Sequence, residues 1–134
     1  ANPNNLIALL DPPNIIAKKV KRSVTDSGTE IRFDQENKPG VSNLLTIHSA
    51  FSGQSIASLE EHFSGKMYGH LKTECADVVI EGLRPIQTRY QELISDKQAL
   101  NSILATGADD AFRRARKTMS KVYKKIGLIP KPRI

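Results

Sequence analysis

The sequence predicts an all-α protein, an irregular orthogonal bundle of about six helices with a long loop near residues 25–40. Helix boundary signals recur along the chain: Asp, Ser or Pro precede apolar residues of helical spacing, and Gly follows them. Strand signals are scarce, because only the short apolar runs at 6–10 and 78–80 could form strands. The second run lies inside a helical pattern, and the unequal helix lengths favour an orthogonal arrangement.

The first helix is expected to follow the connecting stretch 1–10. Asp11 is the predicted N-cap, because its carboxylate can accept a free amide and Pro12 needs no amide partner there. The helix should end near residues 25–28, and the polar, turn-rich stretch 25–40 should form an ordered loop. Its buried face is expected to carry Ile16, Val20 and Val24.

The next two helices are delimited by proline, glycine and serine. One should begin at the Pro39–Gly40 turn and end at Gly53, and Ser55 should cap a short third helix. The turn 65–69 follows, with Gly65 and Gly69 expected at special backbone angles. The buried faces of these helices are expected to carry Leu44, Leu45, Ile47, Phe51, Ile56, Leu59 and Phe63.

The longest predicted helix spans about 70–94, bent at Pro85 because proline removes one ladder hydrogen bond. A short helix from Asp96 to Gly107 and a last helix over 108–126 should follow. The apolar rhythm of the long helix comprises Leu71, Cys75, Val78 or Val79, Leu83, Ile86, Tyr90, and Leu93 or Ile94. The expected seam of the last helix comprises Phe112, Ala115, Met119, Val122 and Ile126.

Composition indicates a soluble chain with a polyanionic partner. The 134 residues carry a net charge of +6, and the isoelectric point is about 9.6. No apolar stretch is long enough to span a membrane, and the start does not resemble a signal peptide. The single cysteine, Cys75, fits a reducing, cytoplasmic setting and a buried hydrophobic position. The few aromatic residues argue against an extended stacking platform for single strands.

Two groups of cations are the candidate nucleic-acid contacts. Charge runs are usually solvated helix faces, but from Ala111 onwards the chain has nine Lys or Arg and no acidic residue. A helix built for stability alone would mix both signs. We therefore expect these side chains to neutralise RNA phosphates, which positions RNA without reading its bases. The candidates are Lys18, Lys19, Arg22, Arg113, Arg114, Arg116 and Lys117.

The sequence offers no catalytic constellation, no cofactor site and no metal site. His48, His62, His70 and Cys75 lack the spacing of metal ligands, and there is no nucleophile elbow or phosphate-binding glycine loop. The paired carboxylates at 109–110 complement a helix N-terminus. Lys66 and Tyr68 in the 65–69 turn could face a ligand, although a structural turn is the simpler interpretation.

Four segments in this order carry a family resemblance: NPNNLIALLDPP at 2–13, KKVKRSVTDSG at 18–28, RFDQENKPGVSNLL at 32–45 and GQSIASLEEHFSGKMYGHLK at 53–72. Together they resemble the C-terminal part of bacterial tryptophanyl-tRNA synthetases, which are class I aminoacyl-tRNA synthetases. The resemblance covers essentially the whole chain. It places the chain just after the mobile KMSKS loop, so the similar-looking KTMSK at 117–121 is a coincidence of composition within a helix.

The resemblance implies a different role for each of three parts of the chain. Residues 1–10 would connect to a missing Rossmann domain, 11–107 would form a helical domain that engages the tRNA anticodon, and 108–134 a basic C-terminal helix and tail. In the family the Rossmann domain binds ATP and tryptophan, so the fragment alone should lack ligase activity. The implied partners are tRNA(Trp), the Rossmann domain and, in the full enzyme, a second subunit. Open alternatives are a structural domain that packs on the catalytic domain, and a generic basic RNA-binding module.

Overall fold

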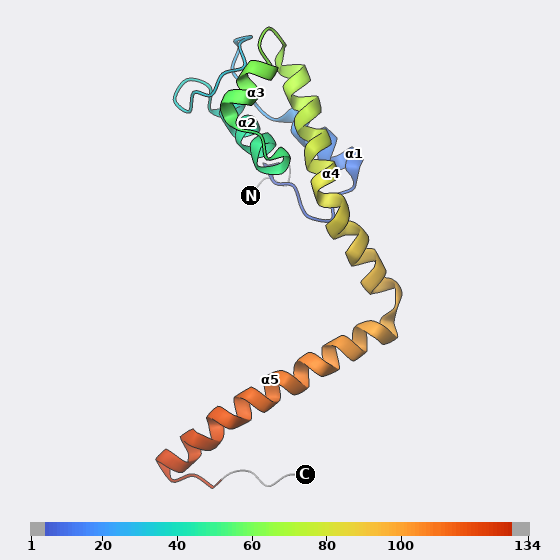
Figure 1. Cartoon of the computed structure of the whole chain (residues 1–134), viewed down its shortest axis with the longest axis vertical. Coiled ribbons are helices and arrows are strands. Elements are labelled where there is room, and N and C mark those ends of the chain that lie inside the picture. The colour runs from blue at the N-terminus through green and yellow to red at the C-terminus, as the bar shows by residue number, and fades with distance from the viewer. Residues whose placement is uncertain (1–4, 130–134) are drawn as a thin grey trace. The chain divides into compact units, whose positions relative to one another are not determined.

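The computed structural model describes residues 5–129, which contain five α-helices and no strand (Figure 1). This confirms the all-α prediction. The chain divides into two compact units, Ala1–Arg89 and Tyr90–Ile134, and each is considered by itself. The helices are α1 (Pro13–Arg22), α2 (Pro39–Ser52), α3 (Ile56–His62), α4 (Tyr68–Ser95) and α5 (Lys97–Ile126).

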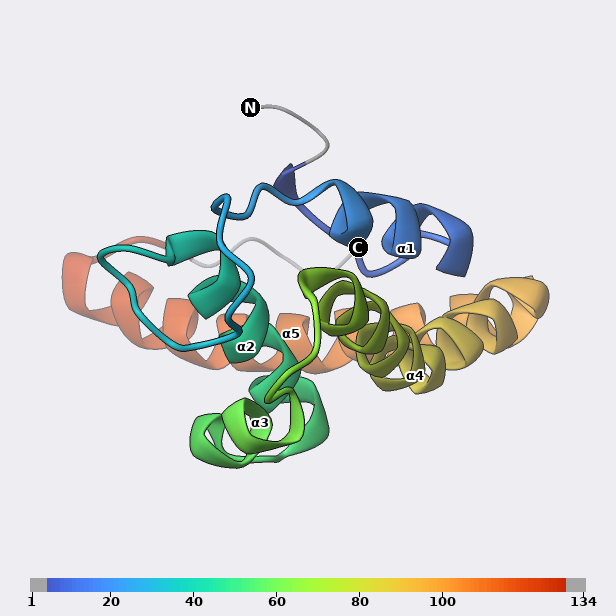
Figure 2. The same ribbon diagram turned by 90° about the horizontal axis from the view of Figure 1, so that it is seen from above.

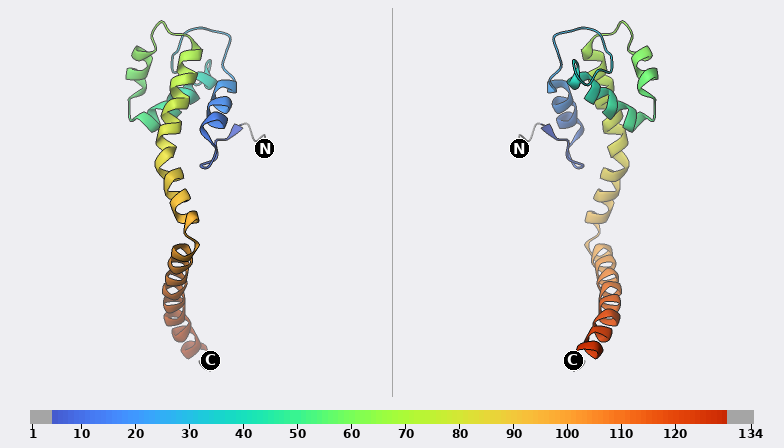
Figure 3. Two further views of the ribbon diagram at one scale, coloured as in Figure 1. Left: turned by 90° about the vertical axis from the view of Figure 1, so that its right-hand side faces the viewer. Right: turned by 90° about the vertical axis from the view of Figure 1, so that its left-hand side faces the viewer.

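The hydrophobic core lies in the first unit. There α1 and α3 lie on different sides of the first half of α4, and α2 packs against α3 (Figures 2 and 3). Burial of each large aliphatic side chain contributes about 1.5–3 kcal/mol, so this cluster is the main source of stability. Its members are Ile16, Val20, Ile31, Val41, Leu44, Leu45, Leu59, Phe63, Leu71, Cys75, Ala76, Val79 and Leu83.

The start of α1 differs from the prediction. Pro12 occupies the N-cap position, and no side chain caps the helix there. The Asp11 carboxylate instead accepts hydrogen bonds from the Ala8 amide at 2.9 Å and the Lys19 ammonium at 2.6 Å. Asp11 was wrongly assigned as the cap. The positive charge of Lys19, about two turns further along the chain, competes better for its carboxylate than a neutral backbone amide does.

Several side chains expected in the core are exposed. Val24 follows the end of α1 at Arg22, so it leaves the helical face and is 86% exposed. On α4, periodicity correctly placed the first half in the core, but Ile86, Tyr90 and Ile94 are exposed. They continue the helical spacing of apolar residues past Leu83, the last core residue of α4. The spacing of apolar residues alone cannot show where a core ends.

The predicted end signals of the short helices are confirmed. Gly53 closes α2 and Gly65 follows α3, each in the left-handed conformation with φ 74°. The Ser55 hydroxyl caps α3 by accepting from the Ser58 amide. Gly69 was wrongly expected at a special angle, because α4 already begins at Tyr68 and Gly69 adopts ordinary helical angles.

The break expected at Gly107 is absent, and α5 is one continuous helix of 30 residues. A lone glycine costs a helix only about 1 kcal/mol relative to alanine, and its neighbours here are compatible with a helix. The other signals are confirmed: the Asp96 carboxylate accepts from the Gln98 and Ala99 amides, and Gly127 closes the helix. No side chain of α5 is buried, so its seam residues, expected on the core side, are exposed or half-exposed.

Gly40 provides a test of this packing. A Cβ added to Gly40 would lie 2.1 Å from the Val24 carbonyl oxygen, where the chain after α1 crosses the start of α2. Since a backbone atom cannot rotate away, Gly40→Ala should lower the free energy of unfolding by about 1–3 kcal/mol. Urea denaturation measures this change. Gly69→Ala is the matched control, because open space surrounds that position; an equal loss in both variants would contradict the packing argument.

Candidate nucleic-acid interface

The three candidate cations of α1 are not equivalent. Lys18 and Arg22 are exposed, and the structure gives neither an ion pair with any residue from 5 to 129. The Lys19 ammonium is instead bound to Asp11, and both side chains are largely buried. The same contact lowers the pKa of Asp11, chiefly through the hydrogen bond from Lys19. Two of the three side chains therefore present free positive charge.

The candidate cations of α5 are more exposed. Arg113 pairs with Asp110 on the preceding turn, whereas Arg114, Arg116 and Lys117 have no ion pair within the described part of the chain. The stretch KTMSK at 117–121 lies inside this regular helix. Five of the seven candidates, two on α1 and three on α5, are thus available to an anion. The RNA contact itself stays a prediction.

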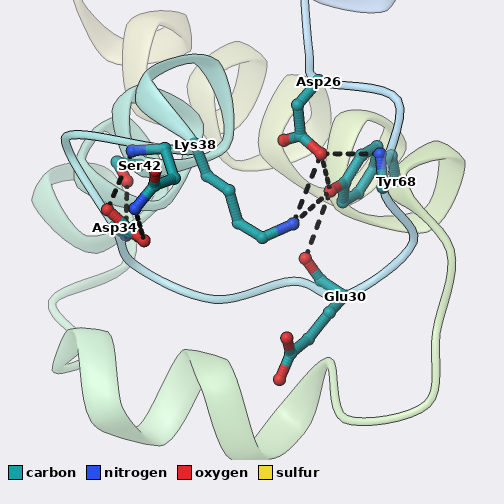
Figure 4. A network of polar contacts seen from close by, with 8 residues as sticks. Asp26, Glu30, Asp34, Lys38, Ser42 and Tyr68 are labelled. Carbon is teal, nitrogen blue, oxygen red and sulfur yellow. Dashed lines mark hydrogen bonds and ion pairs between the residues drawn. The ribbon is translucent and has the colours of Figure 1, made fainter.

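A polar network that the sequence analysis did not single out joins the 23–38 loop to α4 (Figure 4). The Tyr68 hydroxyl donates to the Asp26 carboxylate at 2.7 Å, and the Lys38 ammonium donates to Tyr68 at 2.9 Å and lies 3.3 Å from Asp26. The Gly28 amide also donates to Asp26. The available signal was positional: the three side chains lie within three of the four segments that carry the family resemblance.

The network shifts the ionisation of its members. The pKa of Asp26 is lowered, chiefly by the hydrogen bond from Tyr68 and further by Gly28 and Lys38. The hydrogen bond with Tyr68 raises the pKa of Lys38, and burial raises the pKa of Tyr68. All three groups therefore hold their usual charge states at neutral pH more firmly. That suits a structural lock between the loop and α4 and does not suit proton transfer.

A second polar cluster lies where α3 meets α4. His62 Nε2 is 2.7 Å from the Glu74 carboxylate and 3.1 Å from the Lys66 ammonium. Burial tends to raise the pKa of Glu74, but the contacts with His62 and Lys66 outweigh it and lower the pKa. The cluster has too few ligands for a metal, and no group of three or more such side chains gathers elsewhere in residues 5–129.

Cys75 and His48 are both buried. Burial raises the pKa of the Cys75 thiol to about 11, and its Sγ lies 3.6 Å from the Leu44 carbonyl oxygen. The thiol therefore stays protonated, which matches its expected role as a small buried hydrophobe. His48 is buried against Ser52 and Phe63, and this burial lowers its pKa, so it packs as a neutral ring.

The chain is similar to known tRNA synthetases over nearly its whole length. The family model described as tRNA synthetases class I (W and Y) matches residues 1–84. The chain belongs to this class I tRNA synthetase family. Tryptophan–tRNA ligase 2 of Streptomyces avermitilis is 48% identical over 130 residues, which make up 97% of this chain and 39% of the relative. Tryptophan–tRNA ligase of Bacillus anthracis is 48% identical over 132 residues, or 98% of this chain and 40% of the relative.

A solved synthetase shows the same fold. The crystal structure of tryptophanyl-tRNA synthetase from Mycoplasma pneumoniae is 31% identical, with a TM-score of 0.75 over 96% of this chain and 39% of that chain. The resemblance predicted from four sequence segments is therefore confirmed. The chain spans about two fifths of the length of these synthetases. No helix within residues 5–129 is long and apolar enough to cross a membrane.

The Asp26 network predicts a specific acid response. Because the pKa of Asp26 is lower in the folded state, its stabilising contribution is complete above the unfolded-state pKa and is lost as pH falls through the folded-state pKa. Asp26→Asn should therefore lower the free energy of unfolding at neutral pH and differ less from the wild type at about pH 3. Urea titrations at both pH values measure the difference, with exposed Asp77→Asn as control. A constant difference would contradict the ionic role of Asp26.

Proposed function

We propose that the chain is the helical tRNA-binding part of a tryptophan–tRNA ligase. The observation that carries this proposal is the match at 48% identity, along nearly the whole chain, to tryptophan–tRNA ligases. In the complete enzyme, tryptophan would be activated with ATP and transferred to tRNA(Trp) by a Rossmann domain outside these 134 residues. The chain alone would then be inactive, and the complete enzyme would act as a cytoplasmic homodimer.

The exposed cations support a contact with the tRNA backbone near the anticodon. Lys18, Arg22 and the three unpaired cations of α5 carry charges that no acidic side chain within the described residues neutralises. Each such charge that meets a phosphate releases counterions, which stabilises the complex at low salt. The proposed role of these side chains is therefore to position the RNA, and sequence is read elsewhere.

Salt dependence tests the proposed contact. Binding of the chain to tRNA(Trp) should weaken as salt rises, and Arg22→Gln or Arg116→Gln should each reduce the slope of log K against log salt by about 0.7–0.9. Arg84→Gln is the matched control, because Arg84 is exposed but already paired with Glu81 at 2.5 Å. Fluorescence anisotropy with labelled tRNA provides the measurement. Absence of binding at low salt, or equal slopes for all three variants, would contradict the proposal.

A second candidate function follows from the exposed seam of α5. Phe112 is 66% exposed, Met119 41% and Ile126 60%, an unusual amount of apolar surface along one helix. Under this alternative, α5 packs on another part of the longer enzyme, and the domain is mainly structural. The two functions make different demands on the same helix. The first needs its cations to be free for RNA, whereas in the second its basic face and its apolar seam pack on the rest of the enzyme.

Charge reversal in the complete enzyme separates the two candidates. If α5 binds tRNA, Arg114→Glu with Arg116→Glu should weaken tRNA binding at least about tenfold by reversing two unpaired charges, with little effect on tryptophan activation. Pyrophosphate exchange measures activation, and anisotropy measures tRNA affinity. A fall in activation with unchanged tRNA affinity would favour the structural alternative. Met119→Gln is the complementary variant, which should affect activation only if the seam packs on the enzyme.

A further inference from the structure

A polar cleft of about 470 Å³ lies in the first unit, between the loop before α2 and the turn that joins α3 to α4. The loop contributes residues 29–32, and the turn contributes residues 64–67 together with Glu60 of α3. The cleft thus includes part of the 65–69 turn, whose Lys66 was considered a possible ligand contact on sequence grounds. Neither the phosphate contacts nor the Asp26 network described above uses this space.

Three charged side chains in the cleft retain unused hydrogen-bonding capacity. Arg32 is exposed and makes no hydrogen bond or ion pair with any described residue. Glu60 accepts the Phe33 amide with one carboxylate oxygen at 2.6 Å, and its other oxygen has no partner in the described structure. Glu30 uses only its backbone carbonyl, toward Tyr68, and its carboxylate points away from that contact (Figure 4).

The walls of the cleft are held in place. Ile31 is buried in the core, and the Tyr68 hydroxyl lies 3.2 Å from the Glu30 carbonyl oxygen. On the opposite wall, Lys66 is held by His62 and Glu74. The backbone that carries Glu30 and Arg32 is therefore fixed in advance, which limits the entropy lost when a ligand binds.

The charged side chains around the cleft favour a nucleobase over a phosphate as its ligand. Glu30 and Glu60 would repel a phosphate, and the Lys66 charge is already shared with Glu74. A nucleobase suits the same groups, because a carboxylate accepts from an exocyclic amine while a guanidinium donates to a ring nitrogen or carbonyl oxygen. Met67 is 66% exposed at this site and offers an apolar surface to the face of a base. Unpaired RNA bases are generally read in this way, by their edges and faces.

We propose that this cleft binds one unpaired RNA base that carries an exocyclic amine, with Glu30 and Glu60 as acceptors and Arg32 as donor. The proposal rests on the proposed tRNA-binding function and adds where a base is read. Uracil has no exocyclic amine, so it satisfies only part of this set. A cytosine-containing strand should therefore bind about five- to a hundredfold more tightly than its uracil counterpart.

A single tryptophan can report binding, because the chain contains none. In the otherwise wild-type chain, Met67→Trp should show fluorescence quenching by short cytosine strands at concentrations where uracil strands give little. Met119→Trp on α5 is the control, and its quenching should not discriminate between the two bases. An abasic strand of equal length measures phosphate binding alone. Anisotropy with labelled strands gives the same comparison for the unaltered chain.

Substitutions in the cleft test whether its side chains cause the preference for cytosine over uracil. Glu30→Gln with Glu60→Gln should bring the cytosine-to-uracil ratio close to one and leave abasic-strand binding unchanged or slightly stronger. The amide oxygen introduced by Glu60→Gln can still accept the Phe33 amide, which preserves the local fold. The exposed Glu61→Gln should keep the wild-type ratio. Equal binding of cytosine and uracil strands by the wild type, or an unchanged ratio in the double variant, would overturn the base site.

Binding of the abasic strand tests the phosphate contact separately from the base site. If it binds with the expected salt dependence and no base preference exists, the base site is wrong and the phosphate contact stands. If cytosine strands bind preferentially but the abasic strand does not bind at low salt, the base site stands and the backbone contact is wrong. If neither strand nor tRNA(Trp) binds at low salt, both proposals are wrong.

Discussion

The hydrogen bonds that converge on Asp26 are the constraint on which the organisation of the first unit depends. One carboxylate oxygen receives Tyr68 from the start of α4, Lys38 from the end of the loop and Gly28 from its middle. Loop residues 23–38 have no helix or strand of their own to fix their course. The network supplies that fixation, and burial of Ile31 in the core supplies the rest. Through the Glu30 carbonyl, the same network sets one wall of the polar cleft.

The two units differ in what stabilises them. The first has a continuous hydrophobic core, closed by a backbone approach at Gly40 that admits no side chain. In α5, by contrast, no side chain is buried, so its stability depends on local terms. The Asp96 cap, the Gly127 end and lysines in the last turn provide such terms. A helix of this kind with an apolar seam has surface available for a partner, and both candidate functions supply one.

Sequence patterns predicted this structure where the deciding interaction is local. The caps at Ser55 and Asp96 and the ends at Gly53 and Gly127 were predicted correctly, because each depends on its own few residues. Asp11 was assigned wrongly because its partner, Lys19, lies eight residues away. The Asp26 network joins residues up to 42 positions apart, and only the fold brings them together. The cleft depends on the same long-range geometry, whereas the candidate cations were visible as a charge run.

The distribution of charge assigns different tasks to different surfaces. Exposed cations without acidic partners, such as Arg22 and Arg116, can meet any phosphate, so under the proposed function they would contribute affinity with little sequence information. A site that reads a base needs acceptors as well as donors, and acceptors weaken attraction for the RNA backbone. The carboxylates of Glu30 and Glu60 would therefore be a disadvantage in a phosphate site, but they are suited to a base edge beside Arg32. Under the proposed function, the carboxylates in a cleft held by the Asp26 network would select a base, and the unpaired cations of α1 in the same unit would attract the RNA backbone.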